Sequence, residues 1–431
     1  MNETNRAPRP RTKERVPKEK RARKQATETT EPSLMKNFQR SVRQKIKHFD
    51  LWLFVPFFIL LLFGSLMVYS ASVWWGIIQY GHAPNHYYIR QLVFVALGFA
   101  VFVFAVFIKR KLYTNPFVVV AGGIITVILL IYVRLKGWGS NAGATSWFSI
   151  GGINVQPSEI AKLTIIIVMA TILTACLKNR SADDLRVKHY ALIFSYPLIC
   201  IALVVLQPDL GAVAVMLSIM MAIFIVSGIS VKKYMTMLAG IVVATGLAAL
   251  IGVITGFING NRLGRIKAWF DPFQYETIEG YQVIQGYVAI GSGGLGGVGL
   301  GQSAQKLGYL PEPHTDFIMA VISEELGMWG VLIVVGLLYT IVCRALFIAL
   351  KTNDLSTRFI AAGIGTWIGI QTFINLGGML GFIPLTGVTL PFISYGGTST
   401  VLLSLSMGIL MNISINEKMN ERKKRKGDVA S

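Results

Sequence analysis

Residues 309–325 read YLPEPHTDFIMAVISEE, a string of polar groups that passes directly into an apolar run. Two prolines flank Glu312 and keep it out of a helix, because a residue before a proline favours extended backbone. Thr315 is a good N-cap residue, so we expect a helix to start there with Asp316 in its first turn. The stretch therefore predicts a cluster of polar side chains at one membrane surface, immediately before a spanning helix.

Two further carboxylates, Glu324 and Glu325, follow inside the apolar run. At the rise of an α-helix they lie on the order of 12 Å deeper than Asp316. Charged side chains at that depth are costly and usually mark function.

The composition is that of an integral membrane protein. The 431 residues are 53% hydrophobic and only 14% charged, and the mean hydropathy is +0.57. The net charge of +20 does not predict a nucleic-acid partner, because 15 of the 41 Lys and Arg residues lie in the first 50 positions and six more lie between Lys418 and Lys426. Basic tails of this kind favour anionic lipid headgroups beside a membrane.

The cysteines and histidines predict neither a disulfide framework nor a metal site. Cys176, Cys200 and Cys343 are widely spaced in or beside apolar runs. His314 among scattered carboxylates is a weak zinc pattern. A divalent cation held loosely on phosphate oxygens stays open as a cofactor. The first apolar run follows about 50 polar residues, which predicts an uncleaved signal anchor rather than a cleaved signal peptide.

Apolar runs divide the chain into a basic tail (1–48) that we expect to be disordered, a polytopic membrane domain (49–415) and a second basic tail (416–431). The sequence predicts an all-α protein of about ten transmembrane helices. The expected spans are 51–69, 89–108, 117–133, 158–177, 190–206, 210–228, 235–256, 317–341, 359–380 and 398–415.

The positive-inside rule orients these spans. With both termini cytoplasmic, the inside segments hold 33 basic residues and the remainder of the chain holds eight. Residues 134–157 then form an outside loop, and residues 257–316 form a large extracellular loop between the seventh and eighth spans. Within it, Gly280–Ala289 has the pattern of a short interfacial helix. No internal repeat is evident, which disfavours the inverted-repeat transporter folds.

Gly291–Gly296 reads GSGGLG and matches a dinucleotide fingerprint in letters only. The fingerprint requires a βαβ unit, and no such unit is visible here. Close backbone packing, or backbone amides aimed at phosphate oxygens, are the better interpretations.

Basic residues stand on the outer face, where the positive-inside rule makes them unusual. Arg262, Arg265 and Lys267 lie within six residues, and Lys306 adds a fourth. Snorkelling to the interface is the alternative to binding an anion. The grouping favours an anion at the outer surface.

Lys162 lies early in the fourth span and needs a carboxylate partner, which Glu159, Glu324 or Glu325 could supply. Trp147, upstream in the loop, is either a membrane-interface anchor or part of the same site.

Four motifs together resemble the SEDS family (shape, elongation, division and sporulation) of FtsW- and RodA-type proteins. They are WFSIGGINVQPSEIAK, FDPFQYETIEGYQVIQG, GLGQSAQKLGYLPEPHTDFIMAVISEELG and LPFISYGGTS, and the similar region runs from about Phe49 to Ile415. The long basic N-terminal tail resembles the division members more than the elongation members, and an elongation-type (RodA-like) polymerase stays open as the alternative.

The resemblance implies a bacterial peptidoglycan glycosyltransferase of the cytoplasmic membrane, at the division septum, that polymerises lipid II. It also implies a class B penicillin-binding protein (a transpeptidase) and other division proteins as partners. The family's essential aspartate falls on Asp316. The expected substrate-binding residues are Trp147, Lys162, Arg262, Arg265, Lys306, Glu312, His314 and Ser394.

The family pattern is not complete, since some division members carry a glutamate at Gly308 and a lysine at Thr386. Two alternatives to an enzyme stay open: a flippase for the lipid-linked precursor, and a scaffold that only recruits division enzymes. In the enzyme hypothesis Asp316 takes the proton of the attacking hydroxyl. Positive charge, backbone amides or a metal ion then stabilise the departing pyrophosphate.

Overall fold

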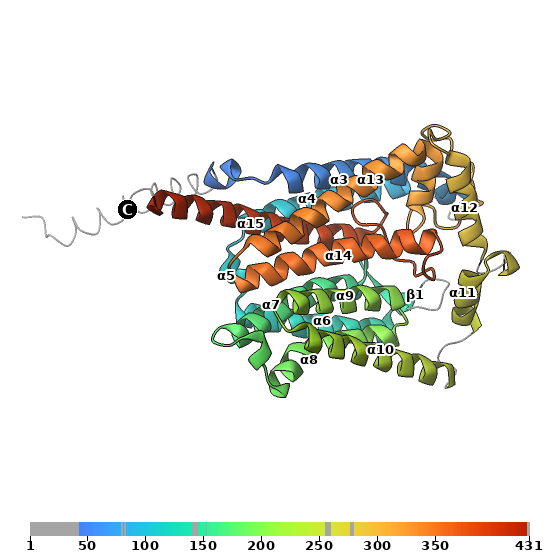
Figure 1. The fold of residues 1–431 in the computed structure, drawn as a ribbon. Helices are drawn as coiled ribbons and strands as arrows, with labels where there is room; N and C mark the ends of the chain where they lie inside the picture. Colours follow the sequence, from blue (N-terminus) through green and yellow to red (C-terminus); the bar gives the residue numbers. More distant parts are fainter. Residues whose placement is uncertain are drawn as a thin grey trace, which may run out of the picture. The chain divides into compact units, whose positions relative to one another are not determined.

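The computed structural model describes residues 43–78, 81, 83–139, 145–151, 153–254, 260–275 and 280–428. The chain separates into two units, Met1–Phe49 and Asp50–Ser431. Most of the predicted basic tail lies outside the described residues, and its described part is helical over 43–47. The second unit contains all the apolar helices (Figure 1).

A helix coincides with each of the ten predicted spans. In the described residues, eight helices are long and apolar enough to cross a membrane, and α9 is a shorter apolar helix of 17 residues. The prediction of an all-α integral membrane fold is therefore confirmed. The helices are α3 (Leu51–Ile78), α4 (His86–Phe107), α6 (Pro116–Lys136), α7 (Pro157–Leu177), α8 (Val187–Leu206), α9 (Leu210–Val226), α10 (Val231–Ile254), α13 (Ile318–Lys351), α14 (Leu355–Met379) and α15 (Gly397–Asp428).

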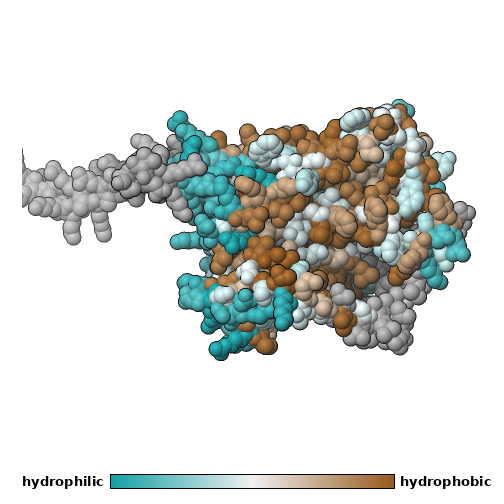
Figure 2. Space-filling model, viewed as in Figure 1, coloured by the Kyte–Doolittle hydropathy of each residue, from teal (hydrophilic) through white to brown (hydrophobic). Residues whose placement is uncertain are grey.

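The surface of the bundle has the pattern that a bilayer requires. Figure 2 shows hydrophobic residues across the middle of the visible face and hydrophilic residues gathered toward its two ends. The exposed apolar side chains of α4 and α6, such as Phe104 and Ile128, contribute to this surface. Because lipid tails solvate such side chains, their exposure is expected on a membrane-spanning bundle.

The loops that connect the helices contact one another in two groups, as the charge pattern predicts. Among the segments predicted inside, Arg110 of α5 (Arg110–Tyr113) pairs with Asp354, and Lys233 pairs with Asp183 of η1 (Ala182–Asp184). Among the segments predicted outside, Thr398 donates to the carbonyl of Asn154, Trp269 to that of Gly381 and Trp75 to that of Leu310. The loops predicted inside therefore lie at one end of the bundle, and the loops predicted outside lie at the other.

Helix α14 lies at the centre of the bundle, packed against α7, α9 and α13 (Figure 1). Its glycines permit the close approach: a Cβ at Gly363 would lie 2.9 Å from Ile166 of α7, and one at Gly365 would lie 2.9 Å from Ala345 of α13. Small residues at helix interfaces are the usual means of packing in membranes, where no hydrophobic effect drives helices together.

The outer segments have more structure than the sequence predicts. The expected loop 134–157 contains a three-stranded antiparallel sheet of β1 (Trp138–Gly139), β2 (Thr145–Ile150) and β3 (Ile153–Val155), in that order. The large loop contains α11 (Gly260–Phe270), η2 (Phe273–Tyr275) and α12 (Tyr281–Gly293). Helix α12 confirms that the stretch Gly280–Ala289 is helical, and it extends four residues further; its place at the membrane interface stays a prediction.

Helix α13 is broken, which corrects the prediction of one continuous span. Gly327 has φ 67° and ψ −163°, and the glycine-rich segment after α12 packs its backbone against this break. The amides of Val298 and Gly299 donate to the carbonyls of Glu324 and Glu325, and a Cβ at Gly297 would lie 2.3 Å from the Glu325 carbonyl. The glycines therefore serve backbone packing, one of the two interpretations left open above.

The second basic tail is also helical, because α15 continues through it to Asp428. Lys418 and Glu421 pair with Asp50 and Lys351 beside this extension. These contacts place the beginning of α3 and the C-terminal part of α15 at the same end of the bundle, as an even number of spans requires.

Candidate functional site

The stretch before α13 is a series of turns rather than the start of a helix. The prediction that a helix begins at Thr315 is wrong: α13 begins at Ile318, and Asp316 precedes it. The Thr315 hydroxyl lies 3.0 Å from both the Glu312 carbonyl and the Asp316 Oδ1, so it closes a local turn instead of capping the helix. Glu312 itself has a φ of 48°, in the left-handed region that only surrounding contacts can maintain.

The Asp316 side chain is half-buried and faces the loop that follows α14. A Cβ at Gly387 would lie 3.9 Å from Asp316 Oδ2. Among the described side chains none forms an ion pair with this carboxylate. Burial raises the pKa of Asp316 above the ordinary value, although the Thr315 hydroxyl and the charge of Arg265 lower it in part. The carboxylate is therefore more basic than that of an ordinary aspartate.

His314 is buried between two tyrosine rings. Its ring centroid lies 4.7 Å from that of Tyr87 and 5.6 Å from that of Tyr395, whose amide donates to the His314 carbonyl. Burial lowers the pKa of His314 to about 4, so the imidazole is neutral. Its Nε2 lies 3.9 Å from Glu312 Oε2.

Glu312 lies close enough to Asp316 for the two carboxylates to interact. Burial first, and then the charge of Asp316, raise the pKa of Glu312. Two neighbouring acids with raised pKa values are an arrangement typical of functional sites.

Of the predicted basic group, Arg265 lies near enough to Asp316 to act on its charge. Its helix, α11, is tied to the bundle by the Trp269 indole, which donates to the Gly381 carbonyl at 2.9 Å. Arg262 lies on the same helix one turn earlier, and its side chain is outside the described part of the chain.

Lys306 is placed differently from the prediction that it faces an anion. Its Nζ lies 2.6 Å from Glu325 Oε1 and 2.8 Å from Ser70 Oγ, and the side chain is buried. The neighbouring Glu324 accepts hydrogen bonds from Ser303 and from the amide of Ala304. The two glutamates therefore anchor the loop 303–306, and the Lys306 charge is already neutralised.

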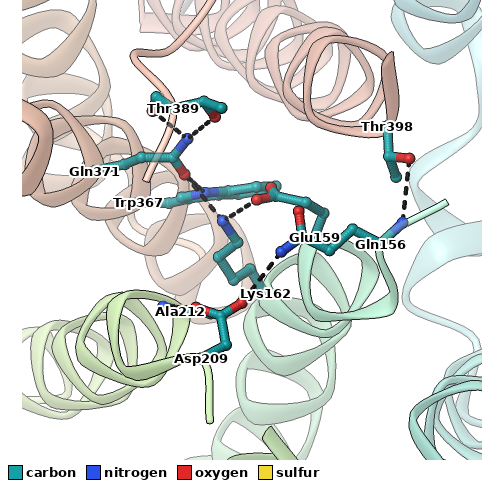
Figure 3. A network of polar contacts seen from close by, with 9 residues as sticks. All are labelled: Gln156, Glu159, Lys162, Asp209, Ala212, Trp367, Gln371, Thr389 and Thr398. Carbon is teal, nitrogen blue, oxygen red and sulfur yellow. Dashed lines mark hydrogen bonds and ion pairs between the residues drawn. The ribbon is translucent and has the colours of Figure 1, made fainter. Parts of the chain in front are cut away.

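Lys162 and its partners form a buried polar network (Figure 3). Lys162 Nζ lies 2.7 Å from Glu159 Oε1 and 3.0 Å from Gln371 Oε1, and the Trp367 ring lies beneath it with its centroid 5.2 Å away. Of the three carboxylates that the sequence offered, Glu159 is the partner. Gln156 extends the network to Asp209 on one side.

Trp147 and Ser394 have local partners of their own. Trp147 is half-buried in β2, opposite Trp138 of β1. The Ser394 hydroxyl is buried and accepts a hydrogen bond from the Leu390 amide at 2.8 Å, so it stabilises its own turn. Its neighbour Tyr395 contacts His314, which brings this motif to the edge of the site.

Two residues of the site were not singled out from the sequence: Gln371 and Asn375. The Asn375 Nδ2 donates to the carbonyls of Asp316 and Val388, both at 2.8 Å. A signal was present, since two amides one turn apart inside an apolar span are costly unless they have partners.

In the described part of the chain, no group of three or more His, Cys, Asp or Glu side chains could hold a metal ion. The loosely held divalent cation stays a prediction about the complex with a phosphorylated substrate. What the site itself offers is a carboxylate with a raised pKa within electrostatic range of an arginine, which suits removal of a proton near a developing anion.

Comparisons with known proteins identify the family of this chain. The model of a family described as "Cell cycle protein", which groups FtsW, RodA and SpoVE, matches residues 51–419. The probable peptidoglycan glycosyltransferase FtsW of Bacillus subtilis is 42% identical over 90% of this chain and 96% of its own length. The stage V sporulation protein E of the same organism is 36% identical over 85% of this chain and 96% of its own.

Two solved structures share the fold. A chain of a peptidoglycan synthase complex has a TM-score of 0.68 at 27% identity, over 85% of this chain and 98% of that one. The rod shape determining protein RodA of Thermus thermophilus has a TM-score of 0.61 at 26% identity, over 85% and 96%. The chain therefore belongs to the cell cycle protein family of FtsW, RodA and SpoVE.

Proposed function

We propose that the protein is a peptidoglycan glycosyltransferase that polymerises lipid II into glycan strands on the outer face of the bacterial cytoplasmic membrane. Lipid II is a disaccharide-pentapeptide carried on undecaprenyl pyrophosphate. The observation that carries the proposal is the Asp316 carboxylate, which lies at the predicted outer end without an ion-pair partner among the described side chains and has a raised pKa. The names of the FtsW relatives support the same activity.

The reaction is a single inverting displacement. A sugar 4-hydroxyl attacks the anomeric carbon of the lipid-linked chain, a new C–O bond forms, and the bond from that carbon to the pyrophosphate oxygen breaks. Asp316 takes the hydroxyl proton as general base. The α-pyrophosphate becomes a β-1,4 linkage, so no covalent intermediate on the protein is needed.

Arg265 stabilises the charge that develops on the departing pyrophosphate, and Arg262, three residues earlier on α11, is proposed to share this role. Lys306 does not take part directly, because Glu325 neutralises it. A divalent cation, when bound on the pyrophosphate oxygens, would supply further positive charge.

The other predicted residues shape the site. We assign to Glu312 and His314 the role of lining the site next to Asp316. The imidazole of His314 is neutral, so it adds no charge to the site. Trp147 and Ser394 are proposed to contact more distant parts of the substrate; the Ser394 hydroxyl keeps its own proton for donation while its oxygen accepts from Leu390.

The buried charges favour an enzyme over a flippase. Lys162 and Lys306 are each paired at 2.7 Å or less with a glutamate, and the side chains of both pairs are buried. Paired charges of this kind hold helices and loops in place. A pathway for a polar headgroup would instead require polar groups that are free to solvate it.

The proposed partners are a class B penicillin-binding protein, which cross-links the strands, and other division proteins at the septum. Similarity to a chain of a peptidoglycan synthase complex supports a transpeptidase partner, and similarity to FtsW supports the septum. A fluorescent fusion at midcell, rather than along the sidewall, is the expected result.

The decisive test uses purified protein and lipid II. Glycan strands resolved by gel electrophoresis are the expected product, with release of undecaprenyl pyrophosphate. Absence of strands, combined with lipid II movement across sealed liposomes, would show a flippase instead. Absence of both, also with the partner transpeptidase present, would leave a scaffold.

A further inference from the structure

Helix α14 carries two buried amides one turn apart, Gln371 and Asn375, which are 0% and 4% exposed. An amide inside a membrane-spanning helix is stable only where its polar atoms have partners. The nitrogens of both side chains donate to segments in the neighbourhood of Asp316, whereas the Asn375 Oδ1 has no hydrogen-bond partner among the described residues.

Gln371 joins the Lys162 network to the loop after α14. Its Oε1 accepts from Lys162 Nζ at 3.0 Å and from the Trp367 indole at 2.7 Å (Figure 3). Its Nε2 points the opposite way and donates to the Thr389 carbonyl at 3.0 Å. The amide orientation is unambiguous, because donors face its oxygen and an acceptor faces its nitrogen.

Asn375 joins the same loop to the site. Its Nδ2 lies 2.8 Å from the Val388 carbonyl and 2.8 Å from the Asp316 carbonyl. Between Thr386 and Leu390 the loop passes the Asp316 carboxylate, at Gly387. One amide therefore holds the backbone of Asp316 and the segment that faces its carboxylate.

We propose that Gln371 and Asn375 are positioning residues for glycosyl transfer, which fix Asp316 and the facing segment 386–390 relative to the Lys162–Glu159 pair. The inference rests on the proposed function. Neither amide touches the reacting carboxylate oxygens. Their effect is geometric, because displacement of a base by about 1 Å from its reactive position lowers the rate on the order of 100-fold.

The proposal can be tested separately for the accepting oxygen and the donating nitrogen of Gln371. Gln371→Glu keeps an oxygen that can accept from Lys162 and Trp367, but it has no proton to donate to the Thr389 carbonyl when ionised. We expect kcat of the folded protein to fall about 10- to 100-fold with the KM for lipid II nearly unchanged. The melting temperature should also fall, because the Thr389 carbonyl loses its donor. Asn375→Leu, of similar size, removes both donors and should show the same loss of kcat.

Thr372 provides a matched control on the same helix. Within the described part of the chain its hydroxyl donates to the Ile368 carbonyl of its own helix and to no other group. Thr372→Val should therefore leave kcat, KM and melting temperature unchanged.

A double-mutant cycle with Asp316→Asn tests whether the amides act through Asp316. If they do, Gln371→Glu or Asn375→Leu lowers kcat in the wild type but causes little further loss in Asp316→Asn. If the fold-losses in kcat of the single variants multiply in the double variant, the proposal is overturned. A normal kcat in Gln371→Glu would overturn it as well. Gln371→Glu tests the proposal even if Asn375→Leu fails to fold. An active wild type with normal variants contradicts this inference alone, whereas a wild type that makes no glycan contradicts the proposed function as well.

Discussion

Asp50 and Asp316 are aspartates at opposite ends of the same bundle, and their surroundings differ in almost every respect. Asp50 is fully buried, with Arg344 at 2.8 Å, Lys418 at 3.2 Å and the Ser414 hydroxyl beside it. Asp316 is half-buried, and no described side chain pairs with it. Burial alone would raise the pKa of both carboxyls. Ser414, Arg344 and Lys418 lower the pKa of Asp50 below its ordinary value, whereas that of Asp316 stays raised.

The difference shows what separates a carboxylate that holds helices together from one that is available for chemistry. Asp50 ties the start of α3 to α13 and α15, and its charge is already compensated. The charge of Asp316 is compensated only in part, by Arg265, so this carboxylate can accept a proton. The predictions below test this division of roles.

The largest effect is expected for Asp316→Asn. Asparagine is nearly isosteric but cannot accept the proton, so kcat should fall by about 10²- to 10⁴-fold. Lipid II affinity should be retained, and the melting temperature should not fall. Turnover of saturating lipid II by the purified variant checks this. Near-normal turnover would remove the general-base role, and loss of lipid II binding would make Asp316 a binding residue.

Lys162→Met should reduce stability more than any other single change considered. It leaves Glu159 charged and unpaired in a buried position, which costs roughly 3–5 kcal/mol of unfolding free energy. Folded yield and melting temperature should fall together with activity. Lys136→Met, at an exposed lysine on α6, is the matched control and should have no effect. Wild-type stability in Lys162→Met would show that the pair is not needed for folding.

Asp50→Asn should lower stability by about 1–3 kcal/mol, since Arg344 and Lys418 lose their charged partner but remain partly exposed to water. Turnover per folded molecule should be normal, because Asp50 lies at the far end from Asp316. Thermal melting together with active-site-normalised turnover measures both. A kcat defect in the folded variant would contradict the division between the two aspartates.

The two aspartates should respond to pH in opposite directions. The stabilisation from Asp50 is present above the ordinary aspartate pKa and is lost as pH falls through its lowered folded-state pKa. The raised pKa of Asp316 favours the folded state below the ordinary value, and this contribution is lost as pH rises through the folded-state pKa. The fall of melting temperature at acid pH should therefore be shallower in Asp50→Asn, with Asp183 and Asp354, whose pKa values are also lowered, supplying the rest. Asp316→Asn should be relatively more stable at neutral pH.

The pH dependence of kcat also tests the raised pKa of Asp316, because this carboxylate must be ionised to act as a general base. The kcat of the wild type should begin to fall with decreasing pH at a higher pH than an ordinary aspartate would give. A profile that is flat down to the ordinary aspartate pKa would contradict the raised pKa.

The smallest perturbation tests which end is outside. Ser292→Cys on exposed α12, in a chain without Cys176, Cys200 and Cys343, should react with an impermeant thiol reagent in intact cells while activity is kept. Labelling only after permeabilisation would reverse the orientation and separate Asp316 from its substrate.

The spans could be predicted from sequence because length, hydropathy and loop charge are local properties. The predicted interfacial helix before Gly291 and the need of Lys162 for a carboxylate followed from local reasoning of the same kind. Three tertiary features could not be predicted in this way. The hydroxyl of Thr315 serves a turn, the break at Gly327 depends on the glycine-rich segment packed against it, and Lys306 finds Glu325 through a loop that folds back.

For the site, sequence placed the carboxylate but not the residues that hold it. Two amides inside one apolar span signal a need for partners but do not identify them, since each amide nitrogen donates to backbone carbonyls that any residue could supply. Contacts to backbone carbonyls leave no signature in the partner's side chain.

The contact between Gly308 and Trp74 couples these two positions. Gly308 has φ 103°, and a Cβ there would lie 2.2 Å from the Trp74 ring. Any side chain at this position, such as the glutamate that the family resemblance leads us to expect in some division members, therefore requires the Trp74 ring to move or to be replaced, and the backbone to leave the left-handed region. The effect of a substitution at position 308 should therefore depend on the residue at position 74.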